Sequence, residues 1–576
     1  MSYVISDKCM HCERCAAQCP SKAIFYNGIH MEIDSEKCTE CGLCAKICLL
    51  EAPYNPAVPK KAIEKHGLIE KECDAVVLGG GGMGMIAAAK LSELSSKKVI
   101  LIEKNVRIGG GAWYARTAKI YNSNWQKDHG VDDPYKFMQD DFIKSMDLTD
   151  YRLDPHLVMN CYKYTGECFD WLYSHFDDTI KDRFKVGRYF SDGPEGLPTP
   201  DYVFPHPEWG DDGIGKQMMI ACKKICEDNG VEILTGTKAY DVEITDKKIS
   251  AVIAEDEGGA YKIKCKACIL ATGSWINNKE LLKKYVPQLA AATPHRSCHL
   301  NPNYTGDGLP IAEKAGASID YDSFCTRNMG PFYYDILQAN EVRTVKTLSV
   351  DGRMIWVNKN GKRWVNERIF ERESIFEACR SLNWQPGAVS YTIFNSSVLN
   401  DIINNPHPER RNLPLFFFGD GTYPDNWKEE IESVLNEGVH MKKADTPEEL
   451  AKLCGIDAEG LKETIAHYNE LCAQGRDTDY GKHDYDLVPM NEGPWYAIIC
   501  HIQTDGAFGG VLVNEKCEAY AKDKENIIEG FYCGGDLASG RFTNVGGWKN
   551  QIINDFAWAI SSGYNAAVHA AEYIEQ

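Results

Sequence analysis

Short apolar runs alternate with glycine-rich turns and helical stretches along much of the chain. Four of these runs predict strands: residues 75–78, residues 97–103, the run that reaches Ala271, and the run that leads to Asp536. The residues after the first run, and those from about Asn550 onward, read as helices. Strands that alternate with helices are typical of an α/β fold. No stretch approaches the roughly 18 uninterrupted apolar residues that a membrane helix needs.

The chain is long and acidic. Its 576 residues exceed the length at which a single hydrophobic core stops growing, so we expect two to four domains. The net charge of −20 and the lack of a basic tract argue against nucleic acid and anionic membranes as partners, although an acidic face can dock a basic protein. The first residues lack a basic start followed by an apolar run. We therefore predict a cytoplasmic protein without membrane insertion.

Eight of the 23 cysteines lie in the first fifty residues, in two matched runs with the spacing C-x2-C-x2-C-x3-C. In such runs three thiolates hold three corners of a 4Fe–4S cluster, and the fourth ligand comes from the other run. The predicted ligands are Cys9, Cys12, Cys15 and Cys48 for one cluster, and Cys19, Cys38, Cys41 and Cys44 for the other. Zinc is the alternative, but a zinc site does not require three cysteines plus a fourth in each of two matched repeats.

The cysteine-rich segment resembles a bacterial two-cluster ferredoxin, and we predict a ferredoxin-like α+β domain over residues 1–51. Leu49 departs from the pattern, because the second run lacks the usual proline, but no ligand is lost. A module of this kind stores and passes single electrons and makes no bonds in a substrate. Residues 52–71 contain prolines and charged side chains, which favours a linker.

A dinucleotide site is predicted directly after the linker. Gly79, Gly81 and Gly84 follow the first strand with the spacing G-x-G-x-x-G, and the next strand ends at Glu103, 19 residues after the last glycine. The glycines let the start of the helix approach a pyrophosphate, and the carboxylate would hold a ribose diol. An incidental acid after a glycine-rich turn is the alternative, and the order strand, glycines, helix, strand and acid argues against it.

Three further segments decide between NAD and FAD. Glycines 109–111 follow Glu103, one strand ends at Ala271-Thr272-Gly273, and Asp536 follows another strand and a glycine pair. These segments combine with three longer motifs, "NYTGDGLPIAEKAGA" (303–317), "IWVNKNGKRWVNE" (355–367) and "ADTPEELAKLCGIDAEGLKETIAHYNELCAQGRDTDYGK" (444–482). On these motifs, residues 72–576 resemble the fumarate reductase / succinate dehydrogenase flavoprotein superfamily, in the soluble branch with flavocytochrome fumarate reductases and 3-ketosteroid dehydrogenases.

The resemblance implies a Rossmann-like FAD-binding domain with an inserted α+β capping domain, and a substrate site between cap and flavin. The FAD-binding domain would comprise residues 72–330 and 486–576, and the cap residues 331–485. The FAD is expected to be non-covalent, because "IGGGAWYARTA" lacks the histidine to which membrane-bound relatives attach it. The expected FAD contacts are Gly79, Gly81, Gly82, Gly84, Glu103, Lys104, Gly110, Gly111, Ala271, Thr272, Gly273, Gly509, Gly510, Asp536, Gly546, Gly547 and Asn550.

The dicarboxylate site of fumarate reductases is not retained. Counted from the matching motifs, the proton-donor arginine becomes Val350, a substrate histidine becomes Gly506, the carboxylate-clamping arginine becomes Asn544, and the first substrate histidine becomes Arg327. A buried carboxylate without a cationic partner costs several kcal/mol. The tyrosines of the ketosteroid dehydrogenase pattern are also missing, since Asn544 and Val545 stand there. Neither named activity therefore transfers directly.

A flavin reaction at an activated C=C bond needs a proton donor or acceptor and a group that polarises the substrate. Arg327 and Lys549 are favoured for these roles because they come from segments that the family places at the flavin. Tyr333 and Arg353 are the other catalytic candidates, and Tyr334 and Arg541 are weaker ones. The alternative for each arginine is a surface charge, and for each tyrosine a place in the core. Trp548, Asn544 and Asp505 are expected at the substrate, and the aromatic side chains favour a ring-bearing molecule.

Three functions remain open from the sequence. The first is an ene-reductase that takes electrons from an external donor, such as a ferredoxin or flavodoxin, through the clusters to FAD. The second is a dehydrogenase that desaturates its substrate and exports electrons, and the third is an electron-transfer subunit, which the cap argues against. No second strand-G-x-G-x-x-G-helix unit for NADH occurs in the sequence. Whether the chain forms a homo-oligomer is left open.

Overall fold

The computed structural model gives positions for most of the chain. The residues that it describes are 2–6, 9, 14–26, 31–48, 51–58, 65–94, 96–115, 118–148, 153–182, 184–187, 202–205, 213–287, 304–332, 343–349, 351–368, 381–382, 384–405, 425–438, 440–539 and 555–576.

Five parallel strands form the centre of the largest sheet. Their order across the sheet is β11 (Glu232–Thr235), β7 (Val99–Glu103), β6 (Ala75–Leu78), β15 (Ala267–Leu270) and β22 (Ile527–Cys533). Numbered along the chain, this order is 3-2-1-4-5, which is the Rossmann arrangement. The predicted α/β fold is therefore confirmed for this part of the chain.

The remaining strands widen the sheet on the β22 side. β13 (Lys248–Glu255) pairs with β22, and β14 (Gly259–Lys264) and β12 (Lys238–Thr245) are its antiparallel neighbours. β5 (Gly67–Glu72) closes this edge by pairing with β14, and β21 (Glu518–Tyr520) pairs with β22.

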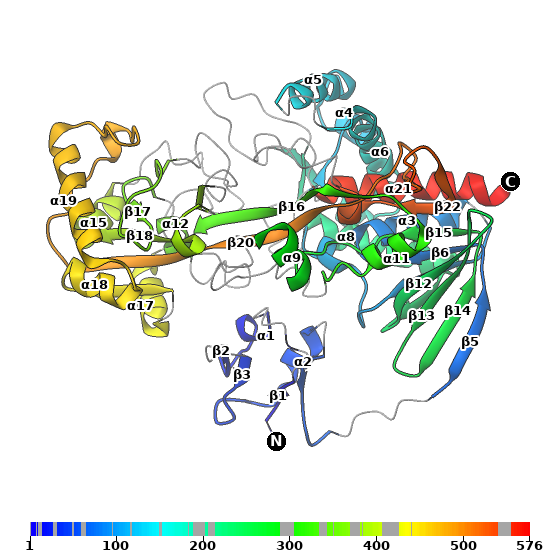
Figure 1. The fold of residues 1–576 in the computed structure, drawn as a ribbon, viewed down its shortest axis with the longest axis horizontal. Coiled ribbons are helices and arrows are strands. Elements are labelled where there is room, and N and C mark those ends of the chain that lie inside the picture. The colour runs from blue at the N-terminus through cyan, green and yellow to red at the C-terminus, as the bar shows by residue number, and fades with distance from the viewer. Residues whose placement is uncertain are drawn as a thin grey trace.

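Helices cover the central strands (Figure 1). α3 (Gly82–Leu94) follows β6 and is buried around most of its circumference, because α8 (Ile214–Asp228) and α21 (Asp555–Glu575) pack against it. α21 also packs on α6 (Pro155–Ser174). A helix that is enclosed on most sides can be apolar over most of its surface, and nine of the 13 residues of α3 are glycine, alanine, methionine or leucine.

A second, antiparallel sheet belongs to the cap. Its order is β16 (Ile319–Phe332), β20 (Trp495–Val511), β18 (Val389–Asn395) and β17 (Ile355–Val357), and β19 (Met441–Ala444) also pairs with β20. β16 and β20 run as long strands from the FAD-binding part into the cap (Figure 1). The helices of the cap are α12 (Arg343–Leu348), α15 (Ser396–Asn404), α17 (Trp427–Glu437), α18 (Pro447–Cys454) and α19 (Ala458–Gln474).

The expected domain boundary at residue 486 needs a correction. Residues 495–501 of β20 pair with β18, and residues 495–498 also pair with β19, so the start of this strand belongs to the cap sheet. Only residues 501–511 of β20 pair with β16. The sequence did not reveal this because one uninterrupted strand serves both units.

The N-terminal module consists of two small sheets and two short helices. β1 (Val4–Ile5) pairs with β4 (Pro53–Tyr54), and β2 (Ile24–Tyr26) pairs with β3 (Met31–Ile33). α1 (Arg14–Ala17) and α2 (Leu43–Ile47) complete it. The expected linker over residues 52–71 is wrong at both ends, because β4 belongs to this module and β5 is an edge strand of the large sheet.

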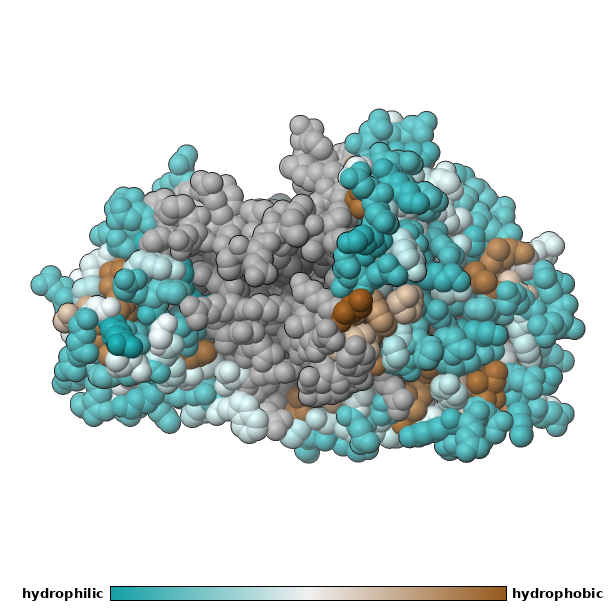
Figure 2. All heavy atoms as spheres, turned by 90° about the horizontal axis from the view of Figure 1, so that it is seen from above, coloured by the Kyte–Doolittle hydropathy of each residue, from teal (hydrophilic) through white to brown (hydrophobic). Residues whose placement is uncertain are grey.

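Shorter elements complete the described part of the chain. They are β8 (Ala118–Lys119), β9 (Phe184–Gly187), β10 (Tyr202–Pro205), α4 (Asn124–Asp128), α5 (Pro134–Leu148), α7 (Asp178–Lys181), α9 (Lys279–Tyr285), α11 (Gly308–Ala315), and the 3-10 turns η1 (Gly110–Tyr114), η3 (Pro386–Ala388), η5 (Asp484–Asp486) and η6 (Gly535–Leu537). The face in Figure 2 is mostly hydrophilic over the described residues, with separate apolar spots. None of the helices described here is long and apolar enough to cross a bilayer.

Candidate functional site

The switch point of the large sheet, which we call the crevice, lies where the paired strands β6 and β15 end side by side. Chain connections leave these two neighbouring strands toward opposite edges of the sheet, and open α/β sheets bind ligands outside such a switch point. Gly79 follows β6 with a φ of +104°, and a Cβ there would lie only 2.3 Å from the carbonyl oxygen of Ala271, which follows β15. The two strand ends can approach this closely because residue 79 has no side chain.

The predicted glycine turn has the shape of a phosphate cradle. A Cβ on Gly84 would lie 1.8 Å from the carbonyl oxygen of Gly79, so the first turn of α3 packs directly on the strand end. At Gly81, by contrast, no atom of the described residues other than its chain neighbours lies within 4 Å of where a Cβ would be. The turn is therefore packed on its inner side and open on its outer side, at the start of a helix that can bind a pyrophosphate.

Glu103 ends β7 and is almost fully buried. One carboxylate oxygen accepts a hydrogen bond from the Gly80 amide at 2.7 Å, and the other accepts from the backbone and side-chain nitrogens of Asn105 at 2.8 and 2.7 Å. Burial raises the pKa of Glu103 above its usual range, although the backbone hydrogen bonds oppose the shift. A carboxylate accepts about four hydrogen bonds, so Glu103 can fix the glycine turn and still take one from a ribose hydroxyl.

Lys104 was predicted to contact FAD, and in the structure its side chain pairs with residues at the start of α11. Its ammonium group contacts Asp307 at 2.5 Å and donates to the Thr305 hydroxyl at 2.8 Å. Lys238 also pairs with Asp307, at 3.0 Å. Burial opposes ionisation of Asp307, but the two lysines lower its pKa. The side chain of Lys104 therefore joins β7 to the start of α11.

Two side chains near the crevice support the fit of FAD. The hydroxyl oxygen of Thr272 is buried and has no hydrogen-bond partner among the described residues, although nearly all buried polar atoms have one. Tyr304 was missed by the sequence reasoning. Its phenol oxygen would lie 2.1 Å from a Cβ on Gly111, and its ring lies 3.4 Å from the position of one on Gly273. Tyr304 thus spans the two glycine segments that were predicted to contact the cofactor.

The C-terminal segments meet the same crevice. Gly510 approaches the carbonyl oxygen of Leu537, where a Cβ would lie 2.0 Å away, and a Cβ on Gly509 would lie 2.7 Å from the ring of Phe324. Asp536 lies in η6 after β22, and η6 is tied to α21 by hydrogen bonds from Gly535 to Ser562 and from Trp558 to Gly535. These close contacts are between protein atoms, so they account for glycine at positions 509 and 510 even when no ligand is bound.

The structure brings Arg327 and Asp505 together on neighbouring strands. Arg327 is the register partner of Gly506, and Asn328 is the partner of Thr504, so Asp505 is the extra residue of a β-bulge. Bulges redirect side chains and are frequent next to active sites. The amide of Ala507 donates a hydrogen bond to the hydroxyl of Ser274 at 3.0 Å, and Ser274 is the residue after Gly273. The strand positions of Arg327 and Asp505 are therefore close to the crevice.

Arg353 was predicted as a catalytic candidate, and the structure instead places its side chain inside the cap. Its side chain is only 1% exposed and lies between Asp351, at 3.3 Å, and Asp401, at 2.8 Å. It also donates to the carbonyl oxygen of Asn405. A guanidinium neutralised by two carboxylates inside the cap has a structural role. The sequence could not show this, because Asp401 is 48 positions away.

Several predicted site residues lie outside the described residues. They are Tyr333, Asn544, Gly546, Gly547, Trp548, Lys549 and Asn550, together with Cys12, Tyr334, Val350 and Arg541.

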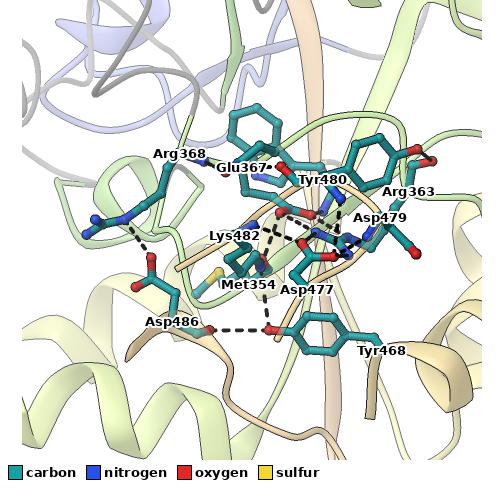
Figure 3. Close-up of polar contacts among 12 residues, drawn as sticks. Met354, Arg363, Glu367, Arg368, Tyr468, Asp477, Asp479, Tyr480, Lys482 and Asp486 are labelled. Atoms are coloured by element: carbon teal, nitrogen blue, oxygen red, sulfur yellow. Dashed lines mark hydrogen bonds and ion pairs between the residues drawn. The ribbon is translucent and has the colours of Figure 1, made fainter. Parts of the chain in front are cut away.

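A buried set of charges in the cap was not predicted. We call it the cap charge network, and its members are Arg363, Glu367, Arg368, Asp477, Lys482 and Asp486 (Figure 3). It contains three cations and three anions, and all six side chains are at most 5% exposed. Arg363 forms a two-point contact with Glu367 and also reaches Asp477 at 3.0 Å.

The rest of the network extends toward β17. Lys482 contacts Glu367 at 3.2 Å and donates to the carbonyl oxygen of Met354 at 2.8 Å, while Arg368 contacts Asp486 at 2.5 Å. Burial lowers the pKa of Lys482. Burial opposes ionisation of Asp477, but Arg363 lowers the pKa of Asp477 to about 2. The network joins the segment after β17 to the segment that leads back to β20.

The cysteines of the N-terminal module lie close together. Burial raises the pKa of the Cys44 thiol, and the neighbouring thiols Cys38, Cys41 and Cys19 raise it further. These three residues are the other predicted ligands of the second cluster. Cys15 is buried in a small apolar core with Ile24 and Met31, against which Cys9, Cys19 and Cys44 pack. Among the described residues, no group of three or more His, Cys, Asp or Glu side chains is placed to hold a single metal ion, so the ligand assignment rests on the spacing of the two cysteine runs.

The fold and the two sites define an iron–sulfur flavoprotein. Family models match both parts: a 4Fe-4S dicluster domain over residues 1–49 and an FAD binding domain over residues 74–547. The chain belongs to this FAD binding domain family, as a flavoprotein of the fumarate reductase and ketosteroid dehydrogenase type with an N-terminal dicluster domain.

Similar proteins of known name include reductases. The chain is 28% identical to a fumarate reductase (cytochrome) from Shewanella frigidimarina over 511 residues, covering 87% of this chain and 77% of that protein. It is 25% identical to vinyl phenol reductase from Lactiplantibacillus plantarum, covering 87% of this chain and 97% of that protein. The fold also matches 3-ketosteroid delta1-dehydrogenase from Sterolibacterium denitrificans, with a TM-score of 0.62, 18% identity, and coverage of 87% of this chain and 100% of that one. The protein is an FAD-dependent oxidoreductase that acts on CH–CH groups, of the class that includes reductases of C=C bonds.

Proposed function

We propose that this protein is an ene-reductase that takes electrons from an external donor through two 4Fe–4S clusters to FAD. The product would form by hydride transfer to an activated C=C bond of a ring-bearing organic substrate other than fumarate. The observation that carries the proposal is the combination of a dicluster domain, over residues 1–49, with an FAD binding domain, over residues 74–547, in one chain.

Each cofactor has a distinct task. When bound, FAD supplies hydride transfer and the clusters supply single electrons. The glycine turn at residues 79–84 would hold the pyrophosphate, Glu103 would accept a hydrogen bond from the ribose, and Thr272 and Tyr304 lie beside the same strand ends. Non-covalent binding is supported by the lack of a histidine in "IGGGAWYARTA", where membrane-bound relatives attach FAD.

The substrate roles belong to residues on and near the bulge of β20. Arg327 is assigned to polarising a substrate oxygen, and its register partner Gly506 has no side chain to compete for the space. Lys549 and Tyr333 are the further candidates for proton transfer, and Asp505, Asn544 and Trp548 are assigned to the substrate. A cation aimed at a carbonyl or carboxylate stabilises the charge that develops there during hydride transfer.

A substrate other than fumarate is supported by the substitutions at the dicarboxylate positions. Val350, Gly506 and Asn544 provide no cation for a second carboxylate. The similarity to vinyl phenol reductase supports a ring-bearing alkene, because that protein is named for one. The external donor is assigned to a small redox protein such as a ferredoxin or flavodoxin, since the clusters exchange one electron at a time.

The proposal is tested by anaerobic reoxidation of the reduced holoenzyme. Dithionite reduces the protein, and enoates, enones, cinnamates and unsaturated steroids are then added while the flavin absorbance is followed. At least one alkene class is expected to reoxidise the FAD, with formation of the saturated product. If no alkene does so while saturated counterparts bleach the oxidised enzyme, the protein is a dehydrogenase and the proposed direction is wrong.

Two variants test the assigned residues. Arg327→Ala and Lys549→Ala are expected to lower turnover at least tenfold while FAD content stays unchanged, because a lost hydrogen bond to a developing charge costs about tenfold or more. Arg476→Ala, an exposed arginine just after α19, is the control and keeps the wild-type rate. Wild-type rates in both site variants would remove these residues from the mechanism.

A further inference from the structure

The loop after β7 contacts the ferredoxin-like module. The guanidinium group of Arg107 donates a hydrogen bond to the backbone carbonyl of Lys46. Lys46 lies in the last turn of α2, between the cluster ligands Cys44 and Cys48. The contact therefore joins a residue four positions after Glu103 to the backbone between two thiolate ligands.

The same loop is fixed to the glycine turn. The amide of Gly109 donates to the carbonyl oxygen of Gly80 at 2.6 Å, and the side chain of Ile108 reaches within 3.0 Å of where a Cβ on Gly80 would be. The amide of Gly80 donates a hydrogen bond to the carboxylate of Glu103. Arg107 thus projects from a segment that is anchored on the dinucleotide turn through the residues on both sides of it.

The end of α2 has a physical reason to bind a cation. The last carbonyl groups of a helix have no partner inside it, and the C-terminus carries a partial negative charge. The amide of Cys48 bonds to the carbonyl of Cys44, and the carbonyl of Lys46 accepts its hydrogen bond from Arg107. Basic side chains near a helix end commonly supply such a hydrogen bond.

We propose that Arg107 is a positioning residue that docks α2 against the FAD turn, and that electrons pass between the clusters and FAD across this contact. The proposal rests on the proposed function, in which the clusters reduce FAD. Two electrons cross one at a time from the reduced clusters, which return to their oxidised state. With both groups bound, the two electrons and two protons from water would convert FAD to its reduced form, and the external one-electron donor would reduce the clusters again.

The position of the guanidinium also has an electrostatic consequence. Reduction adds a negative charge to a cluster, and a nearby cation stabilises the reduced form. Arg107 therefore raises the reduction potential of the adjacent cluster relative to a variant that lacks the charge. A residue that only supported the folding of its loop would not change that potential.

The test uses the anaerobic holoenzyme without any alkene. A reduced ferredoxin is mixed with Arg107→Ala, Arg107→Lys and the wild type, and rapid freeze-quench EPR follows the reduced clusters while absorbance follows FAD. Transfer from clusters to FAD is expected to be about tenfold slower in Arg107→Ala, because the docked state loses a hydrogen bond from a charged group, with a smaller loss in Arg107→Lys. Arg476→Ala is the matched control and keeps the wild-type rate.

Two further measurements separate docking from folding. EPR-monitored titration is expected to show a lower cluster potential in Arg107→Ala, and hydrogen exchange is expected to be faster in residues 43–48, while iron and FAD contents stay unchanged. A wild-type transfer rate together with an unchanged potential would overturn the proposal. Because no alkene takes part, failure to find a substrate would count against the proposed function and leave this result unaffected.

Discussion

The glycine turn of the FAD crevice and the cap charge network both enclose polar groups, but they do so by different means. The turn at residues 79–84 relies on backbone atoms that approach closely where no side chain is present, with Glu103 as its one buried carboxylate. The cap charge network relies on six ionised side chains of balanced charge. A substitution in the glycine turn causes a local steric clash, whereas a substitution in the cap charge network leaves a buried charge without its partner.

The largest effect is expected from Gly84→Ala. The new Cβ would overlap the carbonyl oxygen of Gly79, which is backbone and cannot move aside cheaply. We expect loss of bound FAD and of most folded protein, measured by flavin content and circular dichroism. Gly81→Ala is the matched control, because its Cβ meets no other atom in the part of the chain that the structure describes; it should fold normally and bind FAD poorly. A stable, FAD-loaded Gly84→Ala protein would contradict the packing described for the turn.

Arg363→Met is expected to produce the next largest effect. It removes a cationic partner from two buried carboxylates, Glu367 and Asp477, and breaking a buried ion pair in this way costs about 3–5 kcal/mol of unfolding free energy. Lys362→Met is the control, since the neighbouring Lys362–Glu463 pair is exposed and such pairs contribute less than about 1 kcal/mol. Equal destabilisation of the two variants in urea denaturation would refute the distinction.

Acidification should weaken the cap before it weakens the glycine turn. The pKa of Asp477 is lowered to about 2 in the folded protein, while its value in the unfolded chain is ordinary, about 3.9. Its contribution to stability is therefore complete above pH 4 and is lost as the pH falls from about 4 toward 2. Hydrogen exchange at decreasing pH should show earlier loss of protection in residues 477–486 than in α3. The reverse order would show that another carboxylate controls acid unfolding.

The smallest effect is expected for Glu103→Gln. The side-chain amide keeps one oxygen acceptor for the Gly80 amide, but its NH2 group replaces the oxygen that accepts from Asn105, so the turn keeps its bond to Gly80 while the acceptors left for a ribose hydroxyl are lost. We expect about tenfold weaker FAD binding, as for the loss of one hydrogen bond to a charged group. Fluorescence titration of the apoprotein measures this, with the exposed Glu243→Gln as control. Unchanged affinity would mean that Glu103 only supports the turn.

The comparison also explains which parts the sequence could predict. The glycine turn is encoded within about 25 consecutive residues, from Gly79 to Glu103, so its spacing alone indicated the strand, helix and acid. The cap charge network joins Arg363 to Asp477 across 114 positions, and no local pattern connects them. Arg353 was misassigned for the same reason, since its partner Asp401 is also distant.

Other parts of the site depended on contacts that only the fold supplies. Arg327 and Asp505 were proposed from separate motifs, and their position at one bulge became visible through the register of β16 and β20. Tyr304 had no signal of its own, because a tyrosine before a glycine turn is more often part of a core than of a ligand site. β4 and β5, at the two ends of residues 52–71, were not predicted because the prolines and charged side chains of this segment favour a linker.

The continuity of β20 has a consequence for protein engineering. Residues 495–501 form the cap sheet and residues 501–511 pair with β16 beside the crevice, without an intervening loop. A cap exchanged between relatives to change substrate range would therefore have to be cut inside β16 and β20, in the middle of paired strands. Successful chimaeras should keep β16 and β20 from one parent and replace only the segments between them, so the exchangeable unit would include β17, β18 and β19 together with the cap helices.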